Sequence, residues 1–262
     1  SMMAEADGKL TGRPGIAFVT RGPGATNAAA GIHIARQDST PMILFVGQIG
    51  KEMYGRDAFQ EVDYQQFYGG MAKLVIEVQQ ADRLSEIFSR AYYTAMSGRP
   101  GPVVIALPEN MLTEKTDKKA TAFIDQVSSA PSTKNLAQFI EEIKASSKPI
   151  LVLGGSLWSE KAEKDLISIS EMLGLIILTS HRRQSFFNNL HKNYGGDLGL
   201  GVNPKLIKRI NESDYIVLLG ARLSENPSQG FSLFGIPDHN KKIVHIYPGP
   251  EEIGRIYNPH LG

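Results

Sequence analysis

A glycine-rich segment, TRGPGATN at Thr20–Asn27, contains the residues best suited to bind a ligand. It directly follows an apolar run and precedes an alanine-rich stretch that is typical of a helix. Gly22 and Gly24 permit backbone angles that other residues avoid, and they let a ligand approach the main chain. The first helical turn would leave free N–H groups directed at this loop. A capped strand-to-helix turn without a ligand explains the same residues, and local physics alone favours that simpler interpretation.

A second candidate combines two glutamines with an aromatic side chain. Gln48 follows the next apolar run, while Phe59 and Gln60 lie in the segment GRDAFQE at 55–61. Because ligands bind at the carboxyl ends of strands in parallel sheets, both amides and the phenyl ring could line one site. An ordinary loop in which Asp57 caps a helix is the alternative, and it is favoured when this segment is considered alone.

Other catalytic classes find little support. The 262 residues include no cysteine, which excludes disulfides, thiolate metal sites and cysteine nucleophiles. The six histidines are scattered without metal-ligand spacing, and there is no G-x-S-x-G segment. The net charge is +1, no basic run stands out, and no apolar run could span a bilayer or act as a signal peptide. We therefore expect no nucleic-acid partner, no membrane contact and a cytoplasmic location.

Two series of short apolar runs predict the strands that position these segments. The runs are continuously apolar, so both of their faces should be covered, as in parallel sheets. They alternate with segments of helical spacing at 81–97, 135–145 and 160–173. This alternation predicts an α/β protein with mostly parallel sheets. The strands are expected near 16–20, 42–47, 73–78 and 102–107 in the first series, and near 149–154, 175–179, 215–220 and 243–247 in the second.

A polar stretch between the two series predicts two layered domains. Residues 113–132 are rich in Lys, Thr, Ser and Asp, which is typical of a linker. The first domain is then expected over 1–112 and the second over 133–262.

Five segments of the first domain resemble, in order, the pyrimidine-binding domain of thiamine-diphosphate-dependent enzymes, and especially the acetolactate synthase branch. They are AEADGKLTGRPG, TRGPGATNAAAGIHIA, DSTPMILFVGQI, GRDAFQEVD and SGRPGPVVIALPENM. The resemblance implies that the GPGATN loop and the strand-end glutamine shape the aminopyrimidine pocket, with the Phe-Gln pair at the active-site mouth. The residues implied to bind the cofactor are Gly22, Pro23, Gly24, Asn27, Gln48, Phe59 and Gln60.

The same resemblance implies parts that this sequence does not contain. The family glutamate that activates the cofactor belongs upstream of the segment matching Ala4–Ala6, so Glu5 is not that residue and we assign no catalytic residue. The Gly-Asp-Gly motif that holds Mg²⁺ and the diphosphate is also missing, and Gly196–Leu198 is the nearest string. We therefore expect an N-terminally truncated pyrimidine domain and a fragment that is inactive by itself.

The segment 132–262 resembles the central domain of the same family, which is Rossmann-like. The matching pieces include KPILVLGGSLWSEKAEKDL, GLIILTSHRRQSFFNN and KIVHIYPGPEEIGR. In acetolactate synthases this domain binds FAD in a non-redox role. The residues that would face FAD by resemblance are Gly154, Gly155, Ser180, Gly220, Arg222 and, from the first domain, Arg99. The sequence lacks a full G-x-G-x-x-G, and His181–Gln184 replace the expected stretch, which favours a paralogous branch that has lost FAD.

Together these observations predict a fragment of a thiamine-diphosphate-dependent 2-oxo acid decarboxylase or carboligase, of transferase or lyase type. Its cofactors would be thiamine diphosphate with Mg²⁺, its substrate a 2-oxo acid such as pyruvate, and its parent a homo-oligomer. A non-catalytic module that binds a nucleotide or mediates assembly is the alternative, and a related carboligase acting on another oxo acid is a third. Stoichiometric ligand retention without turnover would favour the module.

Overall fold

The chain folds into two compact units, Ser1–Val127 and Ser128–Gly262, in the computed structural model. The structure describes residues 1–120, 129–156 and 158–262. The linker predicted at 113–132 therefore lies in part, at 121–128, outside the described residues. The domain limits drawn from the sequence stay a prediction.

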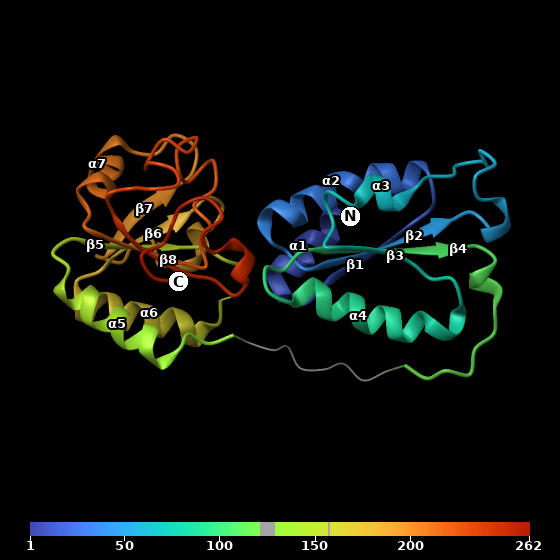
Figure 1. Cartoon of the computed structure of the whole chain (residues 1–262), viewed down its shortest axis with the longest axis horizontal. Helices are drawn as coiled ribbons and strands as arrows, with labels where there is room; N and C mark the ends of the chain where they lie inside the picture. The colour runs from blue at the N-terminus through green and yellow to red at the C-terminus, as the bar shows by residue number, and fades with distance from the viewer. Residues whose placement is uncertain (121–128, 157) are drawn as a thin grey trace. The chain divides into compact units, whose positions relative to one another are not determined.

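Unit 1 is a parallel sheet of four strands in the order β1-β2-β4-β3, with helices on both faces (Figure 1). Helices α1, α2 and α3 cover one face, and α4 covers the other. The elements are α1 (Met2–Thr11), β1 (Gly15–Val19), α2 (Pro23–Asp38), β2 (Met42–Gln48), α3 (Tyr64–Tyr68), β3 (Leu74–Glu77), α4 (Leu84–Met96) and β4 (Pro102–Pro108).

The central strands are apolar along nearly their whole length because both faces are buried. In β2, Met42, Leu44 and Val46 join the core beneath α2 and α3, while Ile43 and Phe45 join the core beneath α4. This double burial explains why the sequence shows continuous rather than alternating apolar runs.

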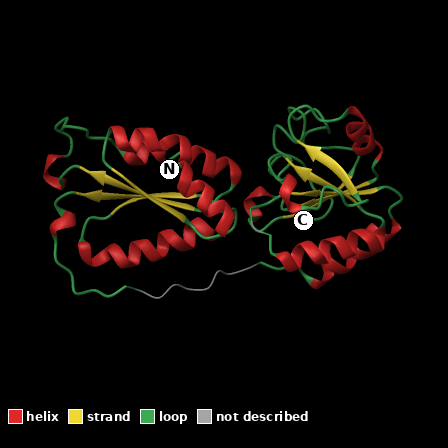
Figure 2. Cartoon of the chain, turned by 180° about the vertical axis from the view of Figure 1, so that it is seen from behind, coloured by secondary structure: helices red, strands yellow, loops and turns green. Residues whose placement is uncertain are grey.

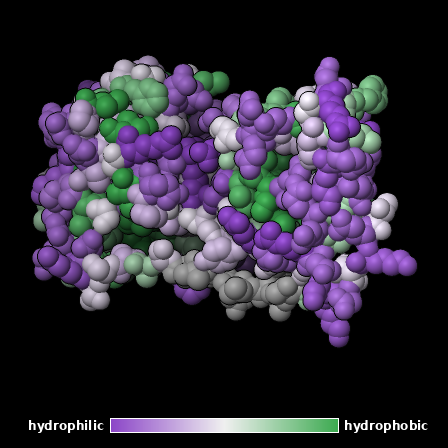
Figure 3. Space-filling view, turned by 45° about the vertical axis from the view of Figure 1, so that its right-hand side comes forward, coloured by the Kyte–Doolittle hydropathy of each residue, from purple (hydrophilic) through white to green (hydrophobic). Residues whose placement is uncertain are grey.

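Strand β1 differs, because one of its faces is open. Ile16 and Phe18 are 47% and 70% exposed, and Phe18 stacks on Phe45 with ring centroids 4.5 Å apart. Apolar side chains reach the surface in both units (Figure 3). Exposed apolar faces of this kind mark contact surfaces for other polypeptides in many proteins.

Unit 2 is a parallel sheet of five strands in the order β7-β6-β5-β8-β9. Helices α5 and α6 lie together on one face, as Figure 2 also shows, and α7 lies on the other. In chain order this is 3-2-1-4-5, the order of doubly wound sheets that bind dinucleotides. The elements are α5 (Thr133–Ala145), β5 (Pro149–Leu153), α6 (Glu160–Leu173), β6 (Ile176–Ser180), β7 (Tyr194–Leu198), α7 (Pro204–Glu212), β8 (Tyr215–Leu219) and β9 (Lys242–Ile246).

The predicted α/β class is confirmed, since both sheets are parallel with interleaved helices. The sequence did not predict β7, whose residues YGGDL include two glycines and an aspartate, which are rare in strands. The edge position of β7 and its shifted register beside Ile177 and Leu178 tolerate this composition. Short 3₁₀ turns complete the fold: η1 (Lys51–Met53), η2 (Ala81–Arg83), η3 (Met111–Thr113), η4 (Gln184–Phe186) and η5 (Pro250–Glu252).

Candidate cofactor-binding site

The glycine-rich loop forms the junction between β1 and α2 at the carboxyl edge of the first sheet. Helix α2 begins at Pro23, earlier than the alanine-rich stretch indicated, because proline suits the first helical position. Gly22 precedes it with a φ of 58°, a conformation that favours glycine. Pro23 and Asn27 are exposed on the first turns of α2. The loop therefore presents a helix N-terminus to solvent, as a ligand-binding loop must.

Gln60 lies directly against this loop although it is far away in the sequence. A β-carbon added at Gly22 would lie 2.6 Å from the Cβ atom of Gln60, so only glycine permits the approach. Phe59 beside it is 78% exposed. The structure thus brings together the two segments that the resemblance assigned to one site.

Glu61 holds the Phe59–Gln60 segment in place, a role that sequence reasoning missed. Its carboxylate accepts hydrogen bonds from the N–H groups of Gly55 (2.8 Å) and Ala58 (2.9 Å). These bonds lower the pKa of the Glu61 carboxyl below its usual value, with the bond from Gly55 the larger cause. The sequence held one hint of this role, which is that Glu61 closely follows the polar segment that begins at Gly55.

Gln48 is buried, and its amide already has backbone partners. The Nε2 atom donates to the carbonyl of Val62 (2.9 Å), and the Oε1 atom accepts from the N–H of Ile49 (2.9 Å). Its predicted contact with a cofactor stays a prediction. The observed bonds give it a different task, which is to fix the segment leading into α3 against the end of β2.

Tyr64 connects the two loops, and no sequence pattern pointed to it. Its hydroxyl accepts a hydrogen bond from the N–H of Gly22 (3.1 Å) and donates one to the carbonyl of Gly47 (3.0 Å). Burial raises the pKa of Tyr64, so the phenol stays protonated and keeps its donor. The hydroxyl of Tyr64 therefore fixes the Gly22 turn against the end of β2.

A cavity of about 320 Å³ opens at this edge, lined by Gln48 and two tyrosines together with three carboxylates. The carboxylates belong to Glu61, Asp63 and Glu77. Tyr54 donates to Glu77 over 2.5 Å, and burial is the main cause of its raised pKa. Such a lining suits a ring that carries hydrogen-bond donors and repels an anion such as a diphosphate. Among the described residues, no group of three or more His, Asp or Glu side chains could hold a metal ion.

Four of the residues predicted to face FAD meet at the carboxyl edge of the second sheet. Gly154 and Gly155 follow β5, and Gly220 and Arg222 follow its neighbour β8. Ser180 ends β6, on the other side of β5. The structure brings these strand ends together, while their contact with FAD stays a prediction.

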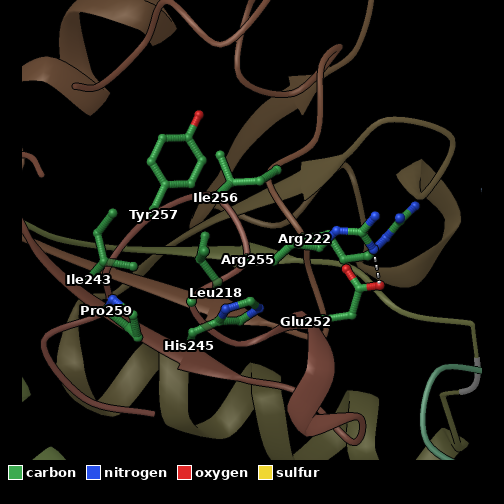
Figure 4. A pocket seen from close by; sticks show the side chains of 10 residues that line it. Leu218, Arg222, Ile243, His245, Glu252, Arg255, Ile256, Tyr257 and Pro259 are labelled. Carbon is green, nitrogen blue, oxygen red and sulfur yellow. Dashed lines mark hydrogen bonds and ion pairs between the residues drawn. The ribbon is translucent and has the colours of Figure 1, made fainter. Parts of the chain in front are cut away.

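Arg222 lines a small cavity in unit 2 (Figure 4). Its volume is about 10 Å³, close to the least that a single buried water needs. His245 is buried there with no hydrogen-bond partner for its Nε2 atom, and burial lowers the pKa of its imidazole. Glu252 and Arg255 form an ion pair at 3.0 Å beside it.

Arg99, also predicted to lie near FAD, is buried within unit 1. Its Nε atom donates to the hydroxyl of Ser39 (3.0 Å), and its Nη2 atom donates to the carbonyl of Arg36 (2.5 Å). These bonds satisfy groups at the C-terminal end of α2. A role toward FAD stays a prediction for this residue.

Comparison with protein-family models identifies both units. Residues 1–67 match the N-terminal TPP binding domain of thiamine pyrophosphate enzymes, and residues 136–262 match the central domain of the same enzymes. The chain belongs to the thiamine pyrophosphate enzyme family. The TPP-binding match contains Gly22, Gln48 and Gln60, which places the candidate site within the part of the family that is named for the cofactor.

The curated relatives carry a consistent name. The chain is 29% identical to the probable acetolactate synthase large subunit of Methanococcus aeolicus, with 97% of this chain and 43% of the relative covered. It is 29% identical to the acetolactate synthase large subunit of Corynebacterium glutamicum, with 95% and 40% covered. It is 32% identical to that of Lactococcus lactis, with 97% and 44% covered. The chain thus spans less than half the length of these relatives.

No helix in the described parts of either unit combines the length and the apolar character needed to cross a bilayer.

Proposed function

We propose that this chain supplies the pyrimidine-binding and central parts of an acetolactate synthase-like enzyme. The whole enzyme would decarboxylate a 2-oxo acid such as pyruvate and transfer the remaining two-carbon unit to an acceptor. The observation that carries this proposal is the contact of the Gly22 loop with Gln60, inside a region that matches the TPP-binding model of the family. The proposed domains are 1–112 and 133–262.

The residues of unit 1 would position the cofactor rather than react with the substrate. The turn at Gly22–Asn27, which is exposed at Pro23 and Asn27, would let the aminopyrimidine ring approach the backbone, while Phe59 and Gln60 would form a wall and an amide contact. Gln48 and Tyr64 would keep these segments in register through the backbone bonds described above. When bound, thiamine diphosphate itself supplies the carbanion chemistry. We assign no catalytic acid or base to this chain.

The diphosphate and its Mg²⁺ would be held by other parts of the enzyme. Three carboxylates line the cavity of unit 1, and their charge opposes an anionic group there. We infer a homo-oligomeric, cytoplasmic parent enzyme, and the exposed Ile16 and Phe18 on β1 support association with another chain.

A chimera tests the proposed function. Residues 1–262 would replace the corresponding segment of the Lactococcus lactis relative, and pyruvate consumption would be followed with thiamine diphosphate and Mg²⁺. We expect turnover by the chimera, and neither calorimetric binding of the cofactor nor turnover by the chain alone. A folded chimera that never consumes any 2-oxo acid would contradict the proposal.

A substitution in the chimera tests the assigned contact. Gln60→Asn shortens the amide by one carbon while tolerating the positive φ of 66° at this position. We expect kcat/KM to fall by about tenfold, the loss of roughly 1.4 kcal/mol of binding to the reacting complex. The control Gln66→Asn changes an exposed glutamine on α3 and should leave kcat/KM within about twofold.

The alternative of a non-catalytic nucleotide-binding or assembly module has less support, because both matched models are parts of one enzyme family.

A further inference from the structure

The strand order of unit 2 reverses between β5 and β8, which is where doubly wound sheets bind dinucleotides. The pyrophosphate of such a ligand normally rests on N–H groups of the first strand-to-helix turn and of the helix that follows. In unit 2 these groups belong to Gly154–Ser156 and to the first turn of α6.

Backbone groups of Gly154 and Gly155 in the turn after β5 already have partners within the chain. The N–H of Gly154 donates to the carbonyl of Leu219 (2.9 Å). The carbonyl of Gly154 accepts from the indole N–H of Trp158 (2.8 Å), and the carbonyl of Gly155 accepts from the Nε atom of Arg183 (2.5 Å). The side chains of Trp158 and Arg183 therefore lie on the carbonyl groups of this turn, where a phosphate would have to displace them.

Arg183 occupies the neighbouring space. The residue is only 7% exposed, and its Nη1 atom donates to the carbonyl of Arg182 (2.9 Å). Its guanidinium carbon lies 5.5 Å from the ring centroid of Phe186, which in turn packs near Trp158. A buried cation that is bound to backbone carbonyls and covered by an aromatic ring is poorly placed to receive a phosphate.

The two turns also touch each other through their backbones. A β-carbon on Gly154 would lie 2.6 Å from the Cα atom of Ala221, and one on Gly220 would lie 2.9 Å from the carbonyl oxygen of Gly154. Leu153 and Gly220 form an isolated bridge. The glycines therefore serve a close approach of the chain to itself.

The N-terminus of α6 carries a side-chain cap of its own. The hydroxyl of Ser159 accepts from the N–H of Ala162 (3.1 Å), and Glu160 and Glu163 lie in the first turn. Carboxylates at this end stabilise the helix and compete with an anionic ligand. The ammonium of Lys164, 3.7 Å from the carboxylate of Glu160, offsets part of this charge.

The cavity beside Arg222 is also too small for a nucleotide. Its free space admits about one water molecule and not an adenosine.

We propose that the carboxyl edge of the second sheet is closed by the chain's own Trp158 and Arg183, so that this protein does not bind FAD or another dinucleotide there. Arg183 takes the space that the pyrophosphate would need and joins β5 to the segment after β6. Unit 2 then acts as a structural domain without a flavin. This inference does not depend on the proposed function.

The test uses the intact chain. FAD and ADP are titrated separately up to about 1 mM, with binding followed by flavin fluorescence for FAD and by the melting temperature of unit 2 for both. We expect no saturable signal and no ligand-dependent rise in the melting temperature. Saturable binding of FAD or ADP with a Kd below about 100 μM would overturn the proposal.

Arg183→Gln tests the closing contact itself. Loss of the buried guanidinium should lower the melting temperature of unit 2 by about 5 °C or more. The matched control, Arg182→Gln, alters the exposed neighbouring arginine and should lower it by less than about 2 °C. Equal melting temperatures for the two variants would overturn the role of Arg183. Where Arg183→Gln does not fold, Trp158→Phe removes the indole N–H that binds the Gly154 carbonyl, together with part of the ring that packs near Phe186, and should give a smaller loss of the same kind.

The chimera separates this inference from the proposed function. Turnover of pyruvate without added FAD agrees with both. Turnover that requires FAD would overturn the closed edge while leaving the proposed function standing.

Discussion

Glu142 on α5 is the centre of a hydrogen-bond cluster that ties the C-terminal segment to unit 2. Its carboxylate accepts from His260 (2.9 and 3.1 Å), from the hydroxyl of Tyr215 (3.0 Å) and from the amide of Gln138 (3.1 Å). The bond from His260 is the main cause that lowers the pKa of Glu142 to about 2. Because the pKa is depressed in the folded state, the stabilisation is present above pH 4.5 and is lost as the pH falls toward 2.

Glu142→Gln should therefore destabilise unit 2 in a pH-dependent way. We expect the free energy of unfolding at pH 7 to fall by roughly 1 to 2 kcal/mol, a value reduced for solvent screening, and the difference from the natural protein to shrink between pH 4.5 and pH 3. Urea unfolding followed by the fluorescence of Trp158, the single tryptophan of the chain, measures it. Glu141→Gln, at the exposed neighbouring position, is the control. A difference that stays constant over this pH range would refute the assignment.

Among the elements, the junction of α1 with β1 is the tightest approach in unit 1. A β-carbon on Gly15 would lie 1.7 Å from the carbonyl oxygen of Ala4, an overlap that requires the helix or the strand to move. A β-carbon on Gly8 of α1 would likewise lie 2.3 Å from the carbonyl oxygen of Pro41. The small residues of α1 thus set its distance from the sheet.

Gly15→Ala should consequently cost about 3 kcal/mol of the unfolding free energy of unit 1, as overpacking does. Gly70→Ala is the matched control, because nothing lies within 4 Å of a β-carbon built there, and it should change the value by less than about 1 kcal/mol. Thermal unfolding followed by circular dichroism distinguishes the two variants. Similar melting temperatures for both would show that α1 adjusts freely.

At the scale of the whole molecule, each unit has its own hydrophobic cores on both faces of its own sheet. Unit 2 should therefore fold without unit 1. We expect a fragment of residues 129–262 to unfold cooperatively in urea, with a Trp158 fluorescence midpoint within about 0.5 M of that in the intact chain. A fragment without a cooperative transition would contradict the independence of the two cores.

Much of the fold could be predicted from local sequence. Continuously apolar runs indicated parallel strands because both sheet faces are covered, and α6 was predicted over its observed range, Glu160–Leu173. The strand β7 escaped prediction because its composition is acceptable only at the edge of a sheet.

The candidate site divides in the same way. The sequence by itself determined which loops follow strands, and therefore that the Gly22 loop, Gln48 and the turns at Gly154 and Gly220 lie at carboxyl edges. Their order in the chain and their residue types also determined the family. These features are local, since strand, turn and glycine can be recognised within a few residues.

Only the tertiary structure decided what those residues contact. The side-chain amide of Gln48 forms hydrogen bonds with the backbone of Val62 and Ile49. Gln60 packs against Gly22, and Arg183 donates a hydrogen bond to the carbonyl of Gly155. The physical reason is that hydrogen-bond partners distant in sequence meet only after the helices and strands have packed. A glycine-rich turn therefore looks the same in the sequence whether it faces a ligand or its own chain.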